Sequence, residues 1–127
     1  FGDDLLVGIS ERISTHLRRH DVFARMGGDE FAVILPEVDI EEARFVAERC
    51  RAVVGDEAFT YEEHNVSVTL SIGAVWLDEP SEMAEMIEAA DRAMYQAKVS
   101  GRNVVVFLEN HSNNTLRRTF HNAPKVA

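Results

Sequence analysis

The chain has 127 residues, of which 46% are hydrophobic, and its formal net charge is −9. This length suits one domain with a sizeable core. The negative charge disfavours binding to a nucleic-acid polymer, which needs a basic surface, and without a run of about 18 apolar residues no membrane-spanning helix is expected. Because Cys50 is the single cysteine, no internal disulfide can form, which favours a reducing, cytoplasmic location.

The first 36 residues predict a helix followed by a β-hairpin. Apolar side chains recur at helical spacing through residues 3–19, and His20 and Asp21 break that pattern. Two short apolar segments, residues 22–26 and 31–35, then flank a glycine-rich turn. Such a pair of segments is typical of two antiparallel strands.

A second helix and a half-buried strand follow. Asp39 is a good N-cap, Glu42 lies three positions later as in a capping box, and Gly55 ends the helical periodicity. Residues 56–65 form a polar stretch with room for a short strand. Residues 66–76 alternate between apolar and smaller or polar side chains, which predicts a strand with one buried face.

The last part predicts a helix, a strand and a polar tail. Ser81 is the expected N-cap of a helix with a methionine-rich apolar stripe, which we assign to the core. Residues 104–107 predict a final strand. From residue 109 the chain turns polar and rich in asparagine, so we expect residues 1–108 to be one domain. Residues 109–127 would be a linker, a tag, a disordered tail or the start of a helix to another domain.

The predicted order is helix, hairpin, helix, strand, helix, strand. With one more strand in front, this becomes a split β-α-β arrangement of ferredoxin-like type. We therefore expect an α+β sandwich in which helices pack on a mainly antiparallel sheet, with the first strand missing from the chain.

The turn of the predicted hairpin is unusual in its chemistry. Gly27 and Gly28 precede the adjacent carboxylates of Asp29 and Glu30. Glycines allow positive φ and let a ligand approach the backbone, and paired carboxylates offer the oxygen ligands that Mg²⁺ prefers. A solvated acidic turn fits the same residues, so the residues alone leave both interpretations open.

Several separated blocks resemble one known family. Residues 27–31 spell GGDEF, and the strand after them ends in Leu-Pro; further blocks are LSIG at 70–73, DRAMYQAK at 91–98 and GRN at 101–103. Together they resemble the diguanylate cyclase, or GGDEF, family over residues 1–108. The resemblance implies a bacterial signalling domain with a nucleotidyl-cyclase palm fold.

The resemblance also implies a reaction. Family members condense two GTP into cyclic di-GMP and release pyrophosphate, with one GTP held by each subunit of a homodimer. It implies that Asp29 and Glu30 are catalytic and ligate Mg²⁺ or Mn²⁺, either of them being the base. It further implies that Gly27 and Gly28 let the nucleotide approach the hairpin.

Three further residues are implied to bind substrate. Asp3 would accept hydrogen bonds from guanine, and Lys98 and Arg102 would neutralise the phosphates, in keeping with catalysis by positioning and charge. Each has a plainer explanation in the helix dipole, because Asp3 lies near a helix N-terminus and the two cations lie near a helix C-terminus.

An inhibitory product site is implied by a second motif. Arg18 and Asp21 form the RxxD pattern that precedes the hairpin in this family and binds cyclic di-GMP, and Arg49 is where the family often supplies another arginine. An arginine fork suits phosphate or a guanine edge. The alternative is a surface ion pair of little energetic value.

The chain departs from the family at its start. The family's first strand, with one metal-binding aspartate, and the segment after it, with a guanine-binding asparagine, would precede Phe1. We therefore expect that strand upstream, and we expect these 127 residues alone to be inactive. Sensor or effector domains are expected in the full protein.

Three functions stay open at this point. The first is a diguanylate cyclase, and the second is an inactive GGDEF module that binds cyclic di-GMP or GTP and regulates a neighbour. The third is an assembly with an EAL-type phosphodiesterase domain, for which residues 116–118 would begin the linker.

Overall fold

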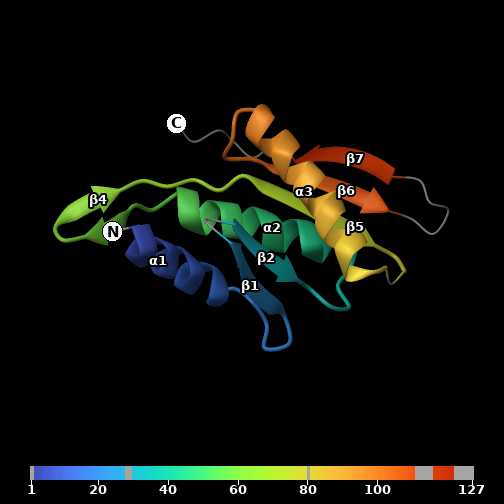
Figure 1. The fold of residues 1–127 in the computed structure, drawn as a ribbon, viewed down its shortest axis with the longest axis horizontal. Coiled ribbons are helices and arrows are strands. Elements are labelled where there is room, and N and C mark those ends of the chain that lie inside the picture. The colour runs from blue at the N-terminus through green and yellow to red at the C-terminus, as the bar shows by residue number, and fades with distance from the viewer. Residues whose placement is uncertain (1, 28–29, 80, 111–115, 122–127) are drawn as a thin grey trace. The chain divides into compact units, whose positions relative to one another are not determined.

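The computed structural model describes residues 2–27, 30–79, 81–110 and 116–121 (Figure 1). The chain divides into two compact units, Phe1–Val68 and Thr69–Ala127. Helices and short sheets alternate along it, which confirms the expected α+β class. Three of the four strand pairs among the described residues are antiparallel. No described helix is long and apolar enough to cross a membrane.

The first unit holds two helices and two hairpins. Its elements are α1 (Gly2–Ser14), β1 (Val22–Gly27), β2 (Glu30–Ile34), α2 (Ile40–Gly55), β3 (Phe59–Tyr61) and β4 (His64–Val66). β1 pairs with β2, and β3 pairs with β4, both antiparallel. The predicted first hairpin is therefore confirmed, and the polar stretch after α2 contains a second one.

The two helices of this unit pack on each other. α1 buries Ile9 and Ile13, and α2 buries Ala43, Cys50 and Val54. Burial raises the pKa of the Cys50 thiol to about 11, so at neutral pH it is an uncharged core group rather than a nucleophile.

The start of α2 follows the sequence prediction. Oδ1 of Asp39 accepts a hydrogen bond of 2.8 Å from the backbone N–H of Glu42, which satisfies one free donor of the first turn. The helix ends at Gly55, where the sequence predicts its end.

α1 is shorter than predicted, because it ends at Ser14 rather than near residue 19. After the helix, two hydrogen bonds join residues three apart instead of the four of an α-helix. The N–H of His16 donates to Ile13 O, and the N–H of Leu17 donates to Ser14 O. The backbone N–H of Arg18 then bonds Oδ2 of Asp21 at 2.7 Å. A side chain from further along the chain therefore takes a donor that a longer helix would have used.

The second unit is built around a parallel strand pair and its connecting helix. Its elements are β5 (Ile72–Leu77), α3 (Met83–Val99), β6 (Val105–Asn110) and β7 (Leu116–His121). β6 lies between β5, which is parallel to it, and β7, which is antiparallel. The core includes Ala93, Ala97, Val106 and Leu108, with Val75 and Val104 packed against it.

Two sequence predictions for this region need correction. The strand predicted over residues 66–76 is interrupted, since Val66 ends β4 and β5 begins only at Ile72. The N-cap of α3 is Glu82 rather than Ser81, and its side chain makes no capping hydrogen bond.

The buried face of α3 consists of alanines rather than methionines. Ala89, Ala93 and Ala97 are buried, whereas the side chain of Met83 is 51% exposed. The reason lies on β5, where a Cβ on Gly73 would meet Met94 N at 2.1 Å and Ala90 O at 2.4 Å. The strand backbone touches the helix backbone at this point, so only small residues fit along the contact.

The region predicted as a linker or tail contains a strand. β6 runs to Asn110, beyond the predicted boundary at residue 108, and Leu116–His121 forms β7. The register places Glu109 opposite Arg117, and residues of opposite charge at facing positions favour antiparallel pairing. A helix start is therefore wrong for Leu116–His121, while the domain boundary and the linker or tail over residues 109–127 stay predictions.

The close contact at Gly73 predicts that one added methyl group strongly destabilises the fold. Gly73→Ala should lower the free energy of unfolding by about 3 kcal/mol or more, because backbone atoms cannot move aside as a side chain can. Gly8→Ala is the control: its Cβ would lie 3.3 Å from Cδ1 of the Phe59 ring, which can shift slightly. Urea unfolding of both variants checks this, and equal midpoints would contradict it.

Candidate functional site

The turn between β1 and β2 carries the expected catalytic carboxylates. The register shifts between Arg25 and Gly27, and Gly27 pairs with Glu30. The Phe23 and Phe31 rings lie 5.4 Å apart between centroids and hold the two strands together near this turn. Glu30 opens β2 with an exposed side chain, free to meet a ligand from solvent.

Two of the predicted turn residues, Gly28 and Asp29, lie outside the described residues. Among the described ones, no three His, Cys, Asp or Glu side chains gather as a metal site would require. Glu30 supplies one suitable oxygen ligand, which alone does not make a magnesium site. Ligation of Mg²⁺ or Mn²⁺ by Asp29 and Glu30 therefore stays a prediction.

The end of α3 presents the two expected phosphate-binding cations. The N–H of Arg102 bonds Ala97 O at 3.1 Å, and the N–H of Gly101 bonds Lys98 O at 3.4 Å. This is the Schellman pattern of a helix C-terminus, with Gly101 at a φ of 113°. Lys98 and Arg102 both lie exposed beside this turn.

The backbone of this turn is strained. Arg102 has a φ of 64° and Asn103 a φ of 49°, both in the left-handed region that residues with a Cβ rarely adopt. Asn103 is buried, so its packing helps to hold the conformation. Strain of this kind, held by its surroundings, places the backbone of Arg102 in one orientation.

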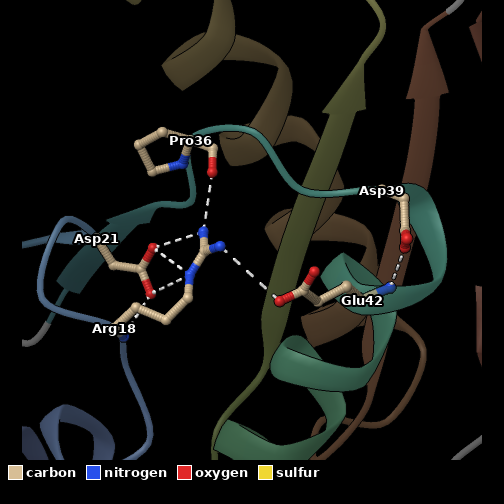
Figure 2. A network of polar contacts seen from close by, with 5 residues as sticks. All are labelled: Arg18, Asp21, Pro36, Asp39 and Glu42. Carbon is tan, nitrogen blue, oxygen red and sulfur yellow. Dashed lines mark hydrogen bonds and ion pairs between the residues drawn. The ribbon is translucent and has the colours of Figure 1, made fainter.

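The RxxD residues form an ion pair with each other, drawn in Figure 2. Nη2 of Arg18 lies 2.9 Å from Oδ1 of Asp21, and Nε donates to the same oxygen at 3.2 Å. Nη2 also donates to the carbonyl of Pro36 at 2.9 Å, and Nη1 lies 3.9 Å from Oε1 of Glu42. The guanidinium thus joins the loop before β1, the end of β2 and the first turn of α2.

The Asp21 carboxylate is enclosed, with 2% of its side chain exposed, whereas Arg18 is 35% exposed. Burial alone raises the pKa of Asp21, but the hydrogen bonds from the Arg18 side chain and backbone, together with its charge, outweigh burial and lower that pKa. Both Asp21 oxygens are already bonded, so Asp21 holds Arg18 in place and Arg18 is the member that faces solvent.

Arg49, the third residue predicted for the inhibitory site, contacts a residue outside this network. Nε of Arg49 donates to Nδ1 of His16 at 3.3 Å. Asp3 lies in the first turn of α1, and its side chain is not among those described.

Sequence reasoning missed two members of the network. Glu42 was assigned to a capping box, but its carboxylate faces Arg18. The carbonyl of Pro36 is a backbone acceptor, for which a sequence carries no signal.

The family model described as "Diguanylate cyclase, GGDEF domain" matches residues 1–104. This chain belongs to the diguanylate cyclase GGDEF family. It is similar to the probable diguanylate cyclase DgcE of Escherichia coli, with 38% identity over 85% of this chain and 10% of that protein.

Solved structures of GGDEF domains are similar as well. The GGDEF domain of PA1120 from Pseudomonas aeruginosa matches with 34% identity and a TM-score of 0.76, over 83% of this chain and 62% of that one. The GGDEF domain of DgcB from Caulobacter crescentus, solved in complex with c-di-GMP, matches with 25% identity and a TM-score of 0.74, over 83% and 63%. The expected fold is thereby confirmed, although the chain spans less than two thirds of each of these relatives.

The lowered pKa of Asp21 predicts an acid-sensitive contribution to stability. The ionised carboxylate of Asp21 stabilises the folded protein above the ordinary pKa of 3.8. This stabilisation is lost as the pH falls through the lower pKa that Asp21 has in the folded protein. Asp21→Asn should therefore unfold at lower urea concentration at pH 7, and its stability should fall less than that of the wild-type protein between pH 5 and about pH 2. Asp91→Asn, an exposed position on α3, serves as the control. Parallel pH profiles of wild-type and Asp21→Asn would contradict this role.

Proposed function

We propose that this domain condenses two GTP molecules into cyclic di-GMP with release of two pyrophosphates. The observation that carries the proposal is the intact GGDEF sequence at a hairpin turn whose Glu30 faces solvent, in a chain of this family. The 3′-oxygen of each GTP forms a bond to the α-phosphorus of the other, and the bond from that phosphorus to pyrophosphate breaks. Two copies of the domain must therefore meet.

The proposed role of each residue follows from the family to which the chain belongs. Glu30 or its neighbour Asp29 takes the proton of the attacking hydroxyl, and both are the proposed ligands for Mg²⁺, which supplies positive charge to the phosphates. Lys98 and Arg102 neutralise the remaining phosphate charge. The Schellman turn supports this assignment for Arg102, since it fixes the backbone from which the side chain extends.

Glu30→Gln tests the catalytic assignment in the protein that carries this domain. Replacing the carboxylate by an amide of the same shape should lower kcat/KM for GTP by at least about 100-fold, because the proton acceptor or metal ligand is lost. Formation of cyclic di-GMP from GTP is measured by chromatography, with Glu41→Gln on the exposed first turn of α2 as the control. Full activity of Glu30→Gln would overturn the assignment.

The alternative is a module that binds cyclic di-GMP or GTP without turning it over. The Arg18–Asp21 pair supports this second function, because Asp21 holds the guanidinium while Nη1 lies 3.9 Å from Oε1 of Glu42, beyond hydrogen-bond distance. Such an arginine has donors left for a phosphate or a guanine edge. DgcB shows that a GGDEF domain of similar fold takes up c-di-GMP.

Calorimetry with cyclic di-GMP tests that binding site. Arg18→Ala should weaken binding at least about tenfold, the effect of one charge-assisted contact, whereas Arg19→Ala, at the exposed neighbouring position, should not. Binding without turnover in the wild-type protein would favour the regulatory module. Equal affinities of both variants would show that Arg18 is not part of the binding site.

A further inference from the structure

One face of α2 lies along the segment that carries the RxxD motif. Glu42 and Arg49 are seven residues apart, close to two helical turns, and therefore share a side of the helix. Oε1 of Glu42 lies 3.9 Å from Nη1 of Arg18, and Nε of Arg49 donates to Nδ1 of His16 at 3.3 Å. The helix therefore meets residues 16–18 at two levels, one at its first turn and one two turns further on.

Phe45 lies on α2 between these two levels. It follows Glu42 by three residues and precedes Arg49 by four, which are the spacings of neighbours on a helix surface. Its side chain is 64% exposed, whereas Cys50 and Val54 of the same helix are buried. The ring of Phe45 therefore contributes little to the core and presents most of its surface to solvent between the two arginine contacts.

Two arginines and one exposed ring match the parts of a cyclic dinucleotide. Cyclic di-GMP offers two negatively charged phosphodiesters and two flat guanine bases. Guanidinium groups suit the phosphates, and an aromatic side chain suits a base, because every base has a π-face that stacks on it.

Both cations are held in place while they stay open to solvent. Asp21 bonds the guanidinium of Arg18, which is partly exposed, and His16 bonds that of Arg49, which is exposed. Groups that are ordered before a ligand arrives lose less conformational entropy when they bind it. The face of α2 thus presents an aromatic ring beside two cations that are already anchored.

We propose that Phe45 is a binding residue for cyclic di-GMP, on which one guanine base stacks while Arg18 and Arg49 hold the phosphates. This inference rests on the second proposed function, the binding of cyclic di-GMP at Arg18. It extends that site along α2, where the arginines meet the charge and Phe45 meets the base. A phenyl ring suits this role because it has two side-chain torsions and loses little conformational entropy on stacking.

Phe45→Leu tests the stacking in the protein that carries this domain. Leucine keeps an apolar side chain that suits a helix but removes the π-face, so the affinity for cyclic di-GMP in calorimetry should fall about tenfold. Phe45→Tyr keeps the ring and should bind as tightly as the wild-type protein. The control is Tyr95→Leu, the same loss of an aromatic ring on α3, where the tyrosine is 68% exposed. This control should leave the affinity unchanged.

Phe45→Trp reports the stacking by fluorescence. An indole that stacks on guanine loses emission, so saturating cyclic di-GMP should quench this variant more than the wild-type protein, whose single tryptophan is Trp76. Tyr95→Trp places a second indole at an exposed position of α3 and should show no added quenching. A merely structural role of Phe45 would not produce this difference.

The outcomes separate the inference from the proposed function. An unchanged affinity of Phe45→Leu, or binding by Phe45→Trp without added quenching, overturns the stacking role and leaves binding at Arg18 standing. A loss of affinity in Phe45→Leu but not in Arg18→Ala overturns a shared site. A wild-type protein that does not bind cyclic di-GMP overturns both this inference and the second proposed function, while the Glu30→Gln assay decides the cyclase proposal separately.

Discussion

The contacts of the Arg18 guanidinium are the interaction on which the first unit depends most. One planar group bonds the buried Asp21, the carbonyl of Pro36 and, at longer range, Glu42 (Figure 2). It therefore fixes the loop before the GGDEF hairpin, the residue after that hairpin and the helix that follows. An arginine fork has five donors in fixed directions, which suits it to hold three chain segments in one geometry.

This arrangement changes the roles within the RxxD motif. Sequence reasoning treats Arg18 and Asp21 as two ligand-binding residues or as a surface ion pair of little value. The structure instead encloses Asp21 and bonds both of its oxygens, while Arg18 stays partly exposed. The exposed member of the pair is thus also the group that bonds the residues on either side of the hairpin.

A feature of the structure could be predicted from the sequence when its cause lay in neighbouring residues. The hairpin and the N-cap at Asp39 follow from neighbouring residues, and both were confirmed. The end of α1 depends on Asp21, which lies seven residues after Ser14. The row of buried alanines on α3 depends on Gly73, which belongs to β5. The strand at Leu116–His121 depends on its pairing with β6. Such causes act between segments, so the pattern of apolar residues within one segment carries no signal for them.

The same distinction between local and distant causes applies to the candidate functional site. The five letters of the GGDEF turn and the spacing of RxxD are visible in the chain, but the groups that hold them are backbone carbonyls and residues of other elements. α1 shows this: Arg12 donates to the carbonyl of Val53 near the end of α2, and Asp21 accepts a hydrogen bond from the N–H of Arg18 after the helix ends. These two contacts join α1 to other segments of the first unit. The positions of the motif residues therefore depend on contacts between elements as well as on the motifs themselves.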